Sequence, residues 1–397
     1  MPKKQNVTAL DVESSIFQTG NPYSKPNVMC AVGVSQKAPD TPTRDIVLRI
    51  EHGPEPYGRQ LDLLHDVLDQ TALLVGFNLK FDIAWLRRYN CVLSRKIRVW
   101  DCQLFAFLKS NQLTDYPSLE ETLQDYGLEG KDRTIEEYWS RGIDTTKIPW
   151  EIVAPRVEKD AQQTLALYEK QLEEFKDWPK ARRNLFRLQC ADLLVLQEIE
   201  HNGLYYNCEA SLQEAGEVEE QIAKLEGKVF DLVGDNRINL SSAPHKSAIL
   251  YGGTIKFAER HCVGVYMSGK KKGEARYRWS TEEKSFPRLI TPAKGSKLQK
   301  EGEYYSTGKE TLAKLKAKGA GRKILTVLKE RNKLSKLVST YLRGLPQFIE
   351  EYQWPRPVLH GTINQCVAVT GRTSSSQPNL QNMDGKVKKF FVSRYVD

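Results

Sequence analysis

Residues 7–14 read Val7-Thr8-Ala9-Leu10-Asp11-Val12-Glu13-Ser14 and place two acids inside a stretch that predicts a β-strand. On a strand, side chains two positions apart lie on the same face. The carboxylates of Asp11 and Glu13 can therefore bind one metal ion together. A polar strand face is the commoner explanation of an Asp-x-Glu pair, and this spacing alone does not decide between the two.

The residues that follow predict an α/β fold, in which three short strands precede alternating helices and strands. Pro, Gly and Asn residues separate the first strands, and apolar residues at helical spacing mark the helices. This order is typical of a mixed sheet with helices packed against it. The expected strands are 7–12, 28–34, 46–50, 73–76 and 97–100, and the expected helices are 61–68, 81–89 and 103–108.

The composition excludes an integral membrane protein and disfavours a disulfide-stabilised scaffold. No run approaches the ~18 apolar residues of a membrane span. The seven cysteines are scattered without a Cys-x-x-Cys motif, which also argues against a structural zinc site. We expect free thiols in a reducing cytoplasm, and the start of the chain does not resemble a secretory signal. The length of 397 residues predicts two or three domains.

Two further acids extend the pair on the first strand. Asp82 lies at the start of a predicted helix, and Asp160 precedes the apolar helical run 161–168. Carboxylate oxygens suit Mg²⁺ or Mn²⁺, and two such ions about 3.5–4 Å apart can activate a water for phosphodiester hydrolysis. Taken alone, Asp160 is more typical of a helix N-cap. The set of four acids in this order favours a metal site.

The second half of the chain is basic. Lys and Arg outnumber Asp and Glu by 59 to 50 overall, but by ten to three in residues 268–300 and by ten to two in residues 309–336. Tyr277, Trp279 and Phe286 interleave with the first of these runs. The pattern suggests a polyanionic partner, while a solvated face is the default explanation of a Lys-rich run.

Two long helices are predicted in this half, at residues 183–200 and 321–342. Apolar residues at helical spacing mark the first of them. Pro287 and Pro292 make residues 268–300 a set of loops or a hairpin rather than a helix.

Three runs in the first half resemble the motifs of the DEDD 3′–5′ exonucleases, which have a ribonuclease H-like fold. They are residues 9–14, residues 78–82, and the segment in which Asp160 precedes residues 164–168. The resemblance implies two Mg²⁺ or Mn²⁺ ions held by four catalytic carboxylates, namely Asp11, Glu13, Asp82 and Asp160. It also implies that Asn78 lies beside the substrate.

Two neighbouring positions bear on the chemistry. The family usually has a Tyr four residues before the last Asp or a His five residues before it, where this sequence has Arg156 and Pro155. Arg cannot act as a base, although its guanidinium can hold a phosphate. Asp101 matches an accessory acid of the family and is equally well explained as the cap of the next helix.

Several runs in the second half resemble family A DNA polymerases, the group of bacterial DNA polymerase I and its phage relatives. Residues 370–382 read TGRTSSSQPNLQN and match the signature TGR-x-SSS-x-PNLQN, and residues 198–204, 239–251 and 336–341 resemble other family segments. Hydroxyls and amides in such a run can contact phosphates and minor-groove edges. By composition alone, a polar loop is the simpler explanation.

The resemblance implies a set of DNA-contacting residues. They are Ser339, Thr340, Asn364, Gln365, Thr370, Gly371, Arg372, Ser374, Ser375, Asn379, Gln381 and Asn382.

On this resemblance we expect an α/β ribonuclease H-like exonuclease domain at 1–176, a mainly α-helical thumb at 177–345 with a basic insertion at about 252–307, and the beginning of a palm at 346–397. The implied function is metal-dependent 3′–5′ exonuclease proofreading in DNA replication, with binding of single-stranded 3′ ends and primer–template DNA. The location would be the host cytoplasm if a phage encodes the chain.

The palm Asp, the fingers helix and the HDE-type turn of the family are not found in the sequence, so we expect a separate polypeptide with palm and fingers to complete the polymerase site. One alternative is a catalytically silent DNA-binding subunit of a split polymerase. Another is a truncated reading frame.

Overall fold

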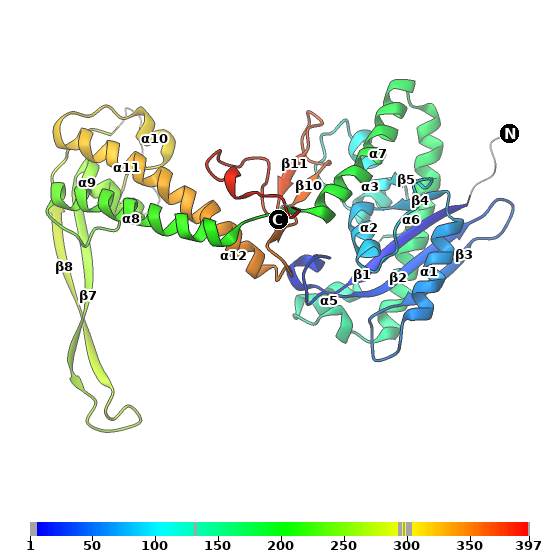
Figure 1. Ribbon diagram of the computed structural model, residues 1–397, viewed down its shortest axis with the longest axis horizontal. Coiled ribbons are helices and arrows are strands. Elements are labelled where there is room, and N and C mark those ends of the chain that lie inside the picture. Colours follow the sequence, from blue (N-terminus) through cyan, green and yellow to red (C-terminus); the bar gives the residue numbers. More distant parts are fainter. Residues whose placement is uncertain (1–5, 131–132, 293–295, 297, 299–303, 396–397) are drawn as a thin grey trace. The chain divides into compact units, whose positions relative to one another are not determined.

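The computed structural model describes residues 6–130, 133–292, 296, 298 and 304–395, and Figure 1 shows its ribbon. The chain forms two compact units, the first comprising residues 1–208 and 345–397 and the second residues 209–344. Both ends of the chain and part of the basic insertion expected at 252–307 lie outside the described residues. The expected division into three domains stays a prediction.

A five-stranded mixed sheet organises the first unit, in the order β3-β2-β1-β4-β5. β1 pairs antiparallel with β2 and β2 with β3, whereas β4 runs parallel to both β1 and β5. The strands are β1 Val7–Ser14, β2 Met29–Lys37, β3 Arg44–Arg49, β4 Leu73–Gly76 and β5 Arg98–Asp101. The predicted α/β class and mixed sheet are confirmed, and all five expected strands are present.

Helices cover both faces of this sheet. Consecutive residues Ala9 and Leu10 of β1 point to opposite faces, and both are buried, as expected for a central strand between two helical layers. The helices are α1 Gly58–Gln70, α2 Leu79–Arg88, α3 Cys102–Lys109, α4 Leu119–Asp125, α5 Thr134–Ser140, α6 Trp150–Asp177 and α7 Lys180–Asn202, with short turns η1 Phe17–Gly20 and η2 Thr145–Lys147. Because α6 begins at Trp150, Asp160 lies inside the helix, and the N-cap explanation of this residue is wrong.

An aromatic cluster attaches α7 to the α/β layers. The Trp100 ring of β5 lies 5.5 Å from Phe105 of α3, 5.1 Å from Phe175 of α6 and 4.6 Å from Phe186 of α7, measured between centroids. Aromatic pairs of this kind add roughly 0.5–1.5 kcal/mol each beyond the area that they bury. The predicted helix 183–200 is confirmed as part of α7, which is packed within the first unit.

Residues 345–395 complete the first unit with two small sheets. In one, β6 Leu204–Tyr205 pairs with β9 Val358–Leu359, and in the other β10 Thr362–Asn364 pairs with β11 Ser374–Ser376. The turn η4 Lys388–Phe390 follows, and α12 Gly344–Glu351 precedes the sheets.

The second unit is a helical body that carries one long β-hairpin (Figure 1). Its helices are α8 Cys208–Val233, α9 Ala243–Tyr251, α10 Lys309–Lys314 and α11 Gly319–Leu337, which continues as the π-helical turn η3 Val338–Leu342. The hairpin consists of β7 Gly253–Val265 and β8 Ala275–Phe286. The predicted helix over 321–342 is thus confirmed, and the segment 268–300 contains the second strand of the hairpin. Among the described helices, none combines the length and the apolar character that a bilayer crossing requires.

One glycine sets the distance between α6 and the sheet. Gly33 of β2 faces Asp11 of β1 in the strand register. A Cβ atom added at Gly33 would lie 2.1 Å from the carbonyl oxygen of Val157 in α6. Only a residue without a side chain lets the helix backbone approach so closely. Because Asp160 follows Val157 by one turn, this contact also positions Asp160 relative to β1.

Replacing Gly33 with Ala should therefore push α6 away from the sheet. We expect the free energy of unfolding to fall by about 1–3 kcal/mol, the usual cost of overpacking, in urea denaturation followed by circular dichroism. Gly58, at the start of α1, has open space where its Cβ would lie, so Gly58→Ala is the matched control and should not destabilise the chain. If Gly33→Ala leaves the urea denaturation midpoint unchanged, that result would contradict the close packing of α6 on β2.

Candidate active site and nucleic-acid interface

Three carboxylates from two elements converge beside the central strand. Asp11 and Glu13 come from β1, and Asp160 comes from α6, which packs against β1 and β2. One oxygen from each of the three lies within 4.8 Å of the others. Glu13 and Asp160 are buried, while Asp11 is half-buried. Three acids at this separation can share one divalent cation, since carboxylate oxygens are the ligands that Mg²⁺ and Mn²⁺ prefer.

Asp82, the fourth predicted acid, lies against the same strand. Its carboxylate Oδ1 accepts a hydrogen bond of 3.1 Å from the backbone N–H of Val12, between the two acids of β1. Burial raises the pKa of Asp82 well above its ordinary value, and the negative charge of Asp11 raises it further. The charge of Asp11 thus opposes ionisation of Asp82, and a cation beside the two carboxylates would favour it.

Asp101 acts as a helix cap, which confirms the second of its two explanations. Its carboxylate accepts hydrogen bonds from the N–H groups of Leu104, 2.9 Å away, and Leu79, 2.7 Å away. It thus caps α3 and also holds the first residue of α2. Burial raises the pKa of Asp101, and these backbone donors lower it.

Arg156 places a buried positive charge among the acids. Its Nε lies 2.7 Å from Asp160 Oδ2, one helical turn along α6, and 4.0 Å from Glu13 Oε1. Its two terminal nitrogens lie 3.0 and 3.1 Å from the carboxylate of Glu136 in α5. The Arg156 side chain is only 2% exposed. The guanidinium is thus a fixed counter-charge that ties Asp160 to a second helix.

A pocket of about 470 Å³ opens beside the acids. Asp11, Glu13 and Asp82 form one part of its lining. The rings of Phe77, Phe81 and Trp139 are also part of the lining. A pocket that combines acids with aromatic rings can hold a charged group next to a planar one.

Sequence reasoning missed the contributions of α5, because no motif links Glu136 and Trp139 to the acidic runs. Only the tertiary fold brings this helix to Arg156. Phe81, in contrast, lies within the run 78–82 that pointed to Asp82, so its position next to the acids could have been inferred.

A second, smaller pocket brings together three of the predicted DNA-contacting residues. Asn78, Asn364 and Gln365 all line a space of about 150 Å³, which Lys80 also lines. Lys80 forms an ion pair with Glu200 of α7, and Glu200 also accepts the backbone N–H of Ile363 in β10. The start of α2 is thereby tied to β10.

The signature run 370–382 is an ordered loop around a short strand. Ser375 is buried, and its hydroxyl accepts a hydrogen bond from the Leu380 N–H at 3.2 Å, so this hydroxyl holds the loop itself. The Asn379 carboxamide oxygen accepts from the N–H groups of Gln381 and Asn382, both at 3.2 Å. The exposed members of the predicted set here are Thr370, Gly371, Arg372, Asn379, Gln381 and Asn382, while Ser374 is half-buried.

Ser339 and Thr340 belong to the second unit. Both are exposed on η3, the turn that continues α11. The Ser339 carbonyl oxygen would lie 2.4 Å from a Cβ added at Gly344, so the chain passes close to this turn as it leaves the unit.

Comparison with known proteins finds similarity to family A DNA polymerases. The family model for DNA polymerase family A matches residues 285–395. DNA polymerase I of Pseudomonas aeruginosa is 26% identical over 324 residues, which cover 79% of this chain and 30% of that protein. The DNA polymerase of Bacillus phage SP01 is 24% identical over 378 residues, covering 86% of this chain and 38% of that protein. The chain thus spans about a third of the length of these relatives.

A solved structure has the same fold at low sequence identity. The polymerase domain of Pol1 from M. smegmatis, solved in complex with DNA primer–template and dNTP, matches with a TM-score of 0.62 and 18% identity. The match covers 97% of this chain and 55% of that one.

Removing the buried guanidinium should expose its role as a counter-charge. In Arg156→Met, the buried Asp160 loses the cation that pairs with it, and we expect the free energy of unfolding to fall by about 3 kcal/mol or more in urea denaturation without divalent metal. The control is Arg133→Met, because Arg133 pairs with Glu120 at the exposed surface, where ion pairs contribute little. A stable Arg156→Met variant would show that the acids do not need this counter-charge.

Proposed function

We propose that the first unit contains a metal-dependent 3′–5′ exonuclease, residues 1–176, that acts in DNA replication as part of a family A DNA polymerase. The observation that carries this proposal is the convergence of Asp11, Glu13 and Asp160 on one point within 4.8 Å. The similarity to DNA polymerases over most of the chain supports DNA as the substrate.

The acids fit a divalent cation by their chemistry and their burial. Asp11, Glu13 and Asp160 would hold one Mg²⁺ or Mn²⁺ ion, and Asp82, whose pKa is raised in part by the charge of Asp11, would complete a site for two. Arg156 brings one positive charge to two of these four carboxylates, Glu13 and Asp160. Bound ions would activate a water and stabilise the leaving oxygen of the terminal phosphodiester.

The chain's own residues would position the 3′ end. Phe81 and Trp139 line the pocket of the acids and would accept the terminal base against their rings. Arg156 cannot remove a proton from the attacking water, because it stays protonated in proteins. It would instead hold Asp160 in place through the 2.7 Å ion pair.

The polar segments would hold the DNA backbone. Asn364 and Gln365 share a pocket with Asn78, and the exposed amides and hydroxyls of 370–382 can donate to phosphates and minor-groove edges without reading sequence. In this interpretation residues 1–176 are the exonuclease domain, 177–345 the thumb and 346–397 the start of a palm. A separate polypeptide with palm and fingers stays a prediction.

Metal binding should be measurable without any reaction. At 100 times its dissociation constant, Mn²⁺ should stabilise the folded chain by about 2.7 kcal/mol, which a thermal melt with and without Mn²⁺ detects as a rise in the melting temperature. The double variant Asp11→Ala plus Glu13→Ala should show no such rise. If Mn²⁺ raises the melting temperature of the double variant as much as that of the parent chain, the metal binds elsewhere.

Hydrolysis should depend on the same two acids, Asp11 and Glu13. We expect the purified chain to remove mononucleotides from the 3′ end of a 5′-labelled single strand in Mg²⁺ or Mn²⁺, and the double variant to be slower by at least about a hundredfold, because even outer-sphere partners of a metal cost up to that factor. Products are resolved on a denaturing gel. A 5′-blocked and a 3′-blocked strand control for polarity, and equal activity in the double variant would refute the assignment.

A second candidate is a catalytically silent DNA-binding subunit of a split DNA polymerase. The observation that favours it is Arg156, which occupies the position of the family's water-positioning Tyr and pairs with Asp160. Mn²⁺-dependent stabilisation and DNA binding without any loss of 3′ nucleotides would support this candidate over the first.

A further inference from the structure

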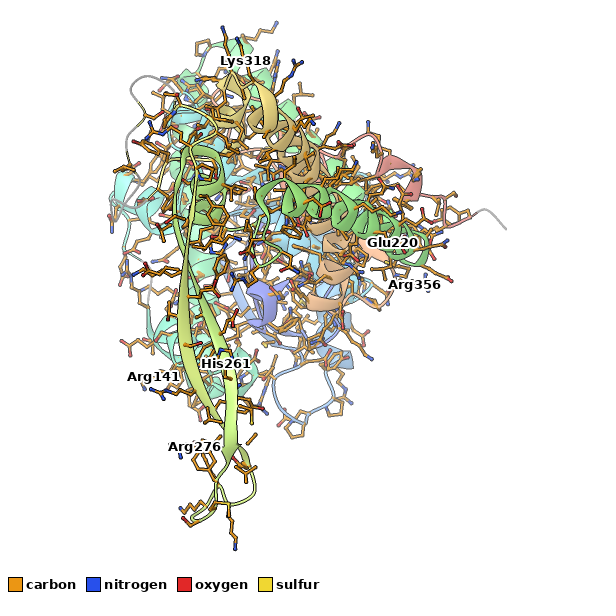
Figure 2. The ribbon with its side chains drawn as sticks, turned by 90° about the vertical axis from the view of Figure 1, so that its left-hand side faces the viewer. Arg141, Glu220, His261, Arg276, Lys318 and Arg356 are labelled. Atoms are coloured by element: carbon orange, nitrogen blue, oxygen red, sulfur yellow. The ribbon has the colours of Figure 1, made fainter. Side chains whose placement is uncertain are left out.

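The distal half of the β7–β8 hairpin, residues 260–279, differs in charge from the base of the hairpin. It contains six Lys or Arg residues against one Glu. The six cations are Arg260, Lys270, Lys271, Lys272, Arg276 and Arg278. Figure 2 shows Arg276 near the far end of the hairpin and His261 nearer its base. The acids gather at the base, as Glu259, Glu282 and Glu283.

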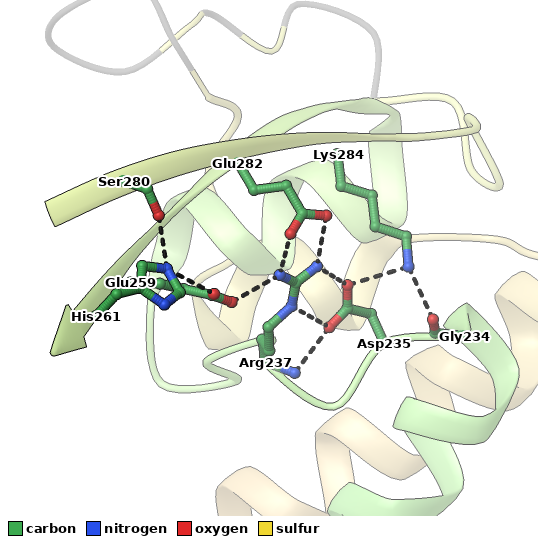
Figure 3. A network of polar contacts seen from close by, with 8 residues as sticks. All are labelled: Gly234, Asp235, Arg237, Glu259, His261, Ser280, Glu282 and Lys284. Atoms are coloured by element: carbon green, nitrogen blue, oxygen red, sulfur yellow. Dashed lines mark hydrogen bonds and ion pairs between the residues drawn. The ribbon is translucent and has the colours of Figure 1, made fainter. Parts of the chain in front are cut away.

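Those basal acids are all neutralised within the unit. Arg237, from the loop between α8 and α9, lies 3.0 Å from Glu259 and 2.7 Å from Glu282. Figure 3 draws both ion pairs. Lys256 lies 3.1 Å from Glu283. In the described part of the chain, the six distal cations have no comparable ion pair. The positive charge of the distal half is therefore available to a partner.

The base also anchors the hairpin by burial. Ile255, Phe257 and Phe286 are buried in the core of the second unit, and the Arg237 guanidinium lies 4.3 Å from the centre of the Phe257 ring. Lys284 adds an ion pair of 3.0 Å to Asp235 (Figure 3). The distal half thus extends from a fixed base.

One face of the distal half presents aromatic rings to solvent. Trp279 faces Arg260 and Tyr277 faces Cys262 in the strand register, so these four side chains share a face. Trp279 is 64% exposed and Tyr277 is 44% exposed. The Arg260 guanidinium lies 3.6 Å from the centre of the Tyr277 ring. Exposed rings between cations are the arrangement on which unpaired bases stack.

The combination of exposed aromatic rings with cations that form no ion pair among the described residues favours one class of partner. Protein interfaces are depleted of Lys, whereas the distal half contains the run Lys270, Lys271 and Lys272. A duplex offers phosphates, but its bases are already stacked and cannot lie flat on Trp279. A single strand offers both phosphates and free base faces.

We propose that residues 260–279 form a binding arm for single-stranded DNA, with unpaired bases stacked on Trp279 and Tyr277 and phosphates bound by the surrounding Lys and Arg residues. This proposal rests on the proposed function only in taking DNA as the nucleic acid that is bound. It requires neither the acids nor hydrolysis.

The test is fluorescence anisotropy of a labelled oligo-dT strand titrated with the full chain in EDTA, where metal-dependent hydrolysis cannot occur. Stacking contributes about 1–3 kcal/mol per base, so Trp279→Ala should weaken binding roughly 5- to 150-fold. Trp279→Phe keeps an aromatic face and should retain most of the affinity. Replacing Lys270, Lys271 and Lys272 together with Ala should flatten the salt dependence, by up to about 2 in the logarithmic slope.

The control for a surface change on the same hairpin is Thr281→Ala, since Thr281 is exposed on β8 outside residues 260–279 and should leave affinity unchanged. A blunt duplex of equal length should lose little affinity in Trp279→Ala. The proposal is overturned if Trp279→Ala leaves oligo-dT binding unchanged, or weakens single strand and duplex equally. Because the assay contains no metal, failure of the exonuclease proposal would leave its outcome unaffected.

Discussion

The approach of α6 to β2 at Gly33 is the contact on which the candidate active site depends. A side chain there would meet the Val157 carbonyl oxygen at 2.1 Å, so the absence of a Cβ lets the helix backbone lie directly on the strand. Gly33 is paired with Asp11 in the sheet, and Val157 lies one turn from Asp160. One backbone contact therefore fixes the separation of acids that are 149 positions apart in the sequence.

The negative charges of these carboxylates repel one another, and the positive charge of Arg156 offsets part of that repulsion. The guanidinium is buried between Asp160, Glu13 and Glu136 and links α6 to α5. Buried charges are tolerated only when they are paired or coordinate a metal. Burial is the main cause of the raised carboxyl pKa of Asp82, and the neighbouring negative charge of Asp11 raises it further.

Periodicity and motif order predicted most of the first unit. The alternation of short apolar runs with turns indicated all five strands, and strand geometry alone placed Asp11 and Glu13 on one face. The start of α6 was not predictable in the same way, because Pro155 and Arg156 interrupt the apolar pattern before Asp160. The role of Glu136 was also not predictable, since its pairing with Arg156 arises from a contact between helices that share no motif. The burial of Ser375 depends on the pairing of β11 with β10, which sequence spacing does not reveal.

The cysteines are placed so that one exposed thiol on the hairpin can be labelled selectively. Five of the seven thiols are buried, and burial raises the pKa of Cys91 to about 11 and of Cys190 to about 12, which keeps them protonated and unreactive. Cys262 is exposed, on the face that it shares with Tyr277 and Trp279. A maleimide dye or nitroxide spin label at neutral pH would attach there first, so the unmodified chain already offers a spectroscopic reporter beside the aromatic rings.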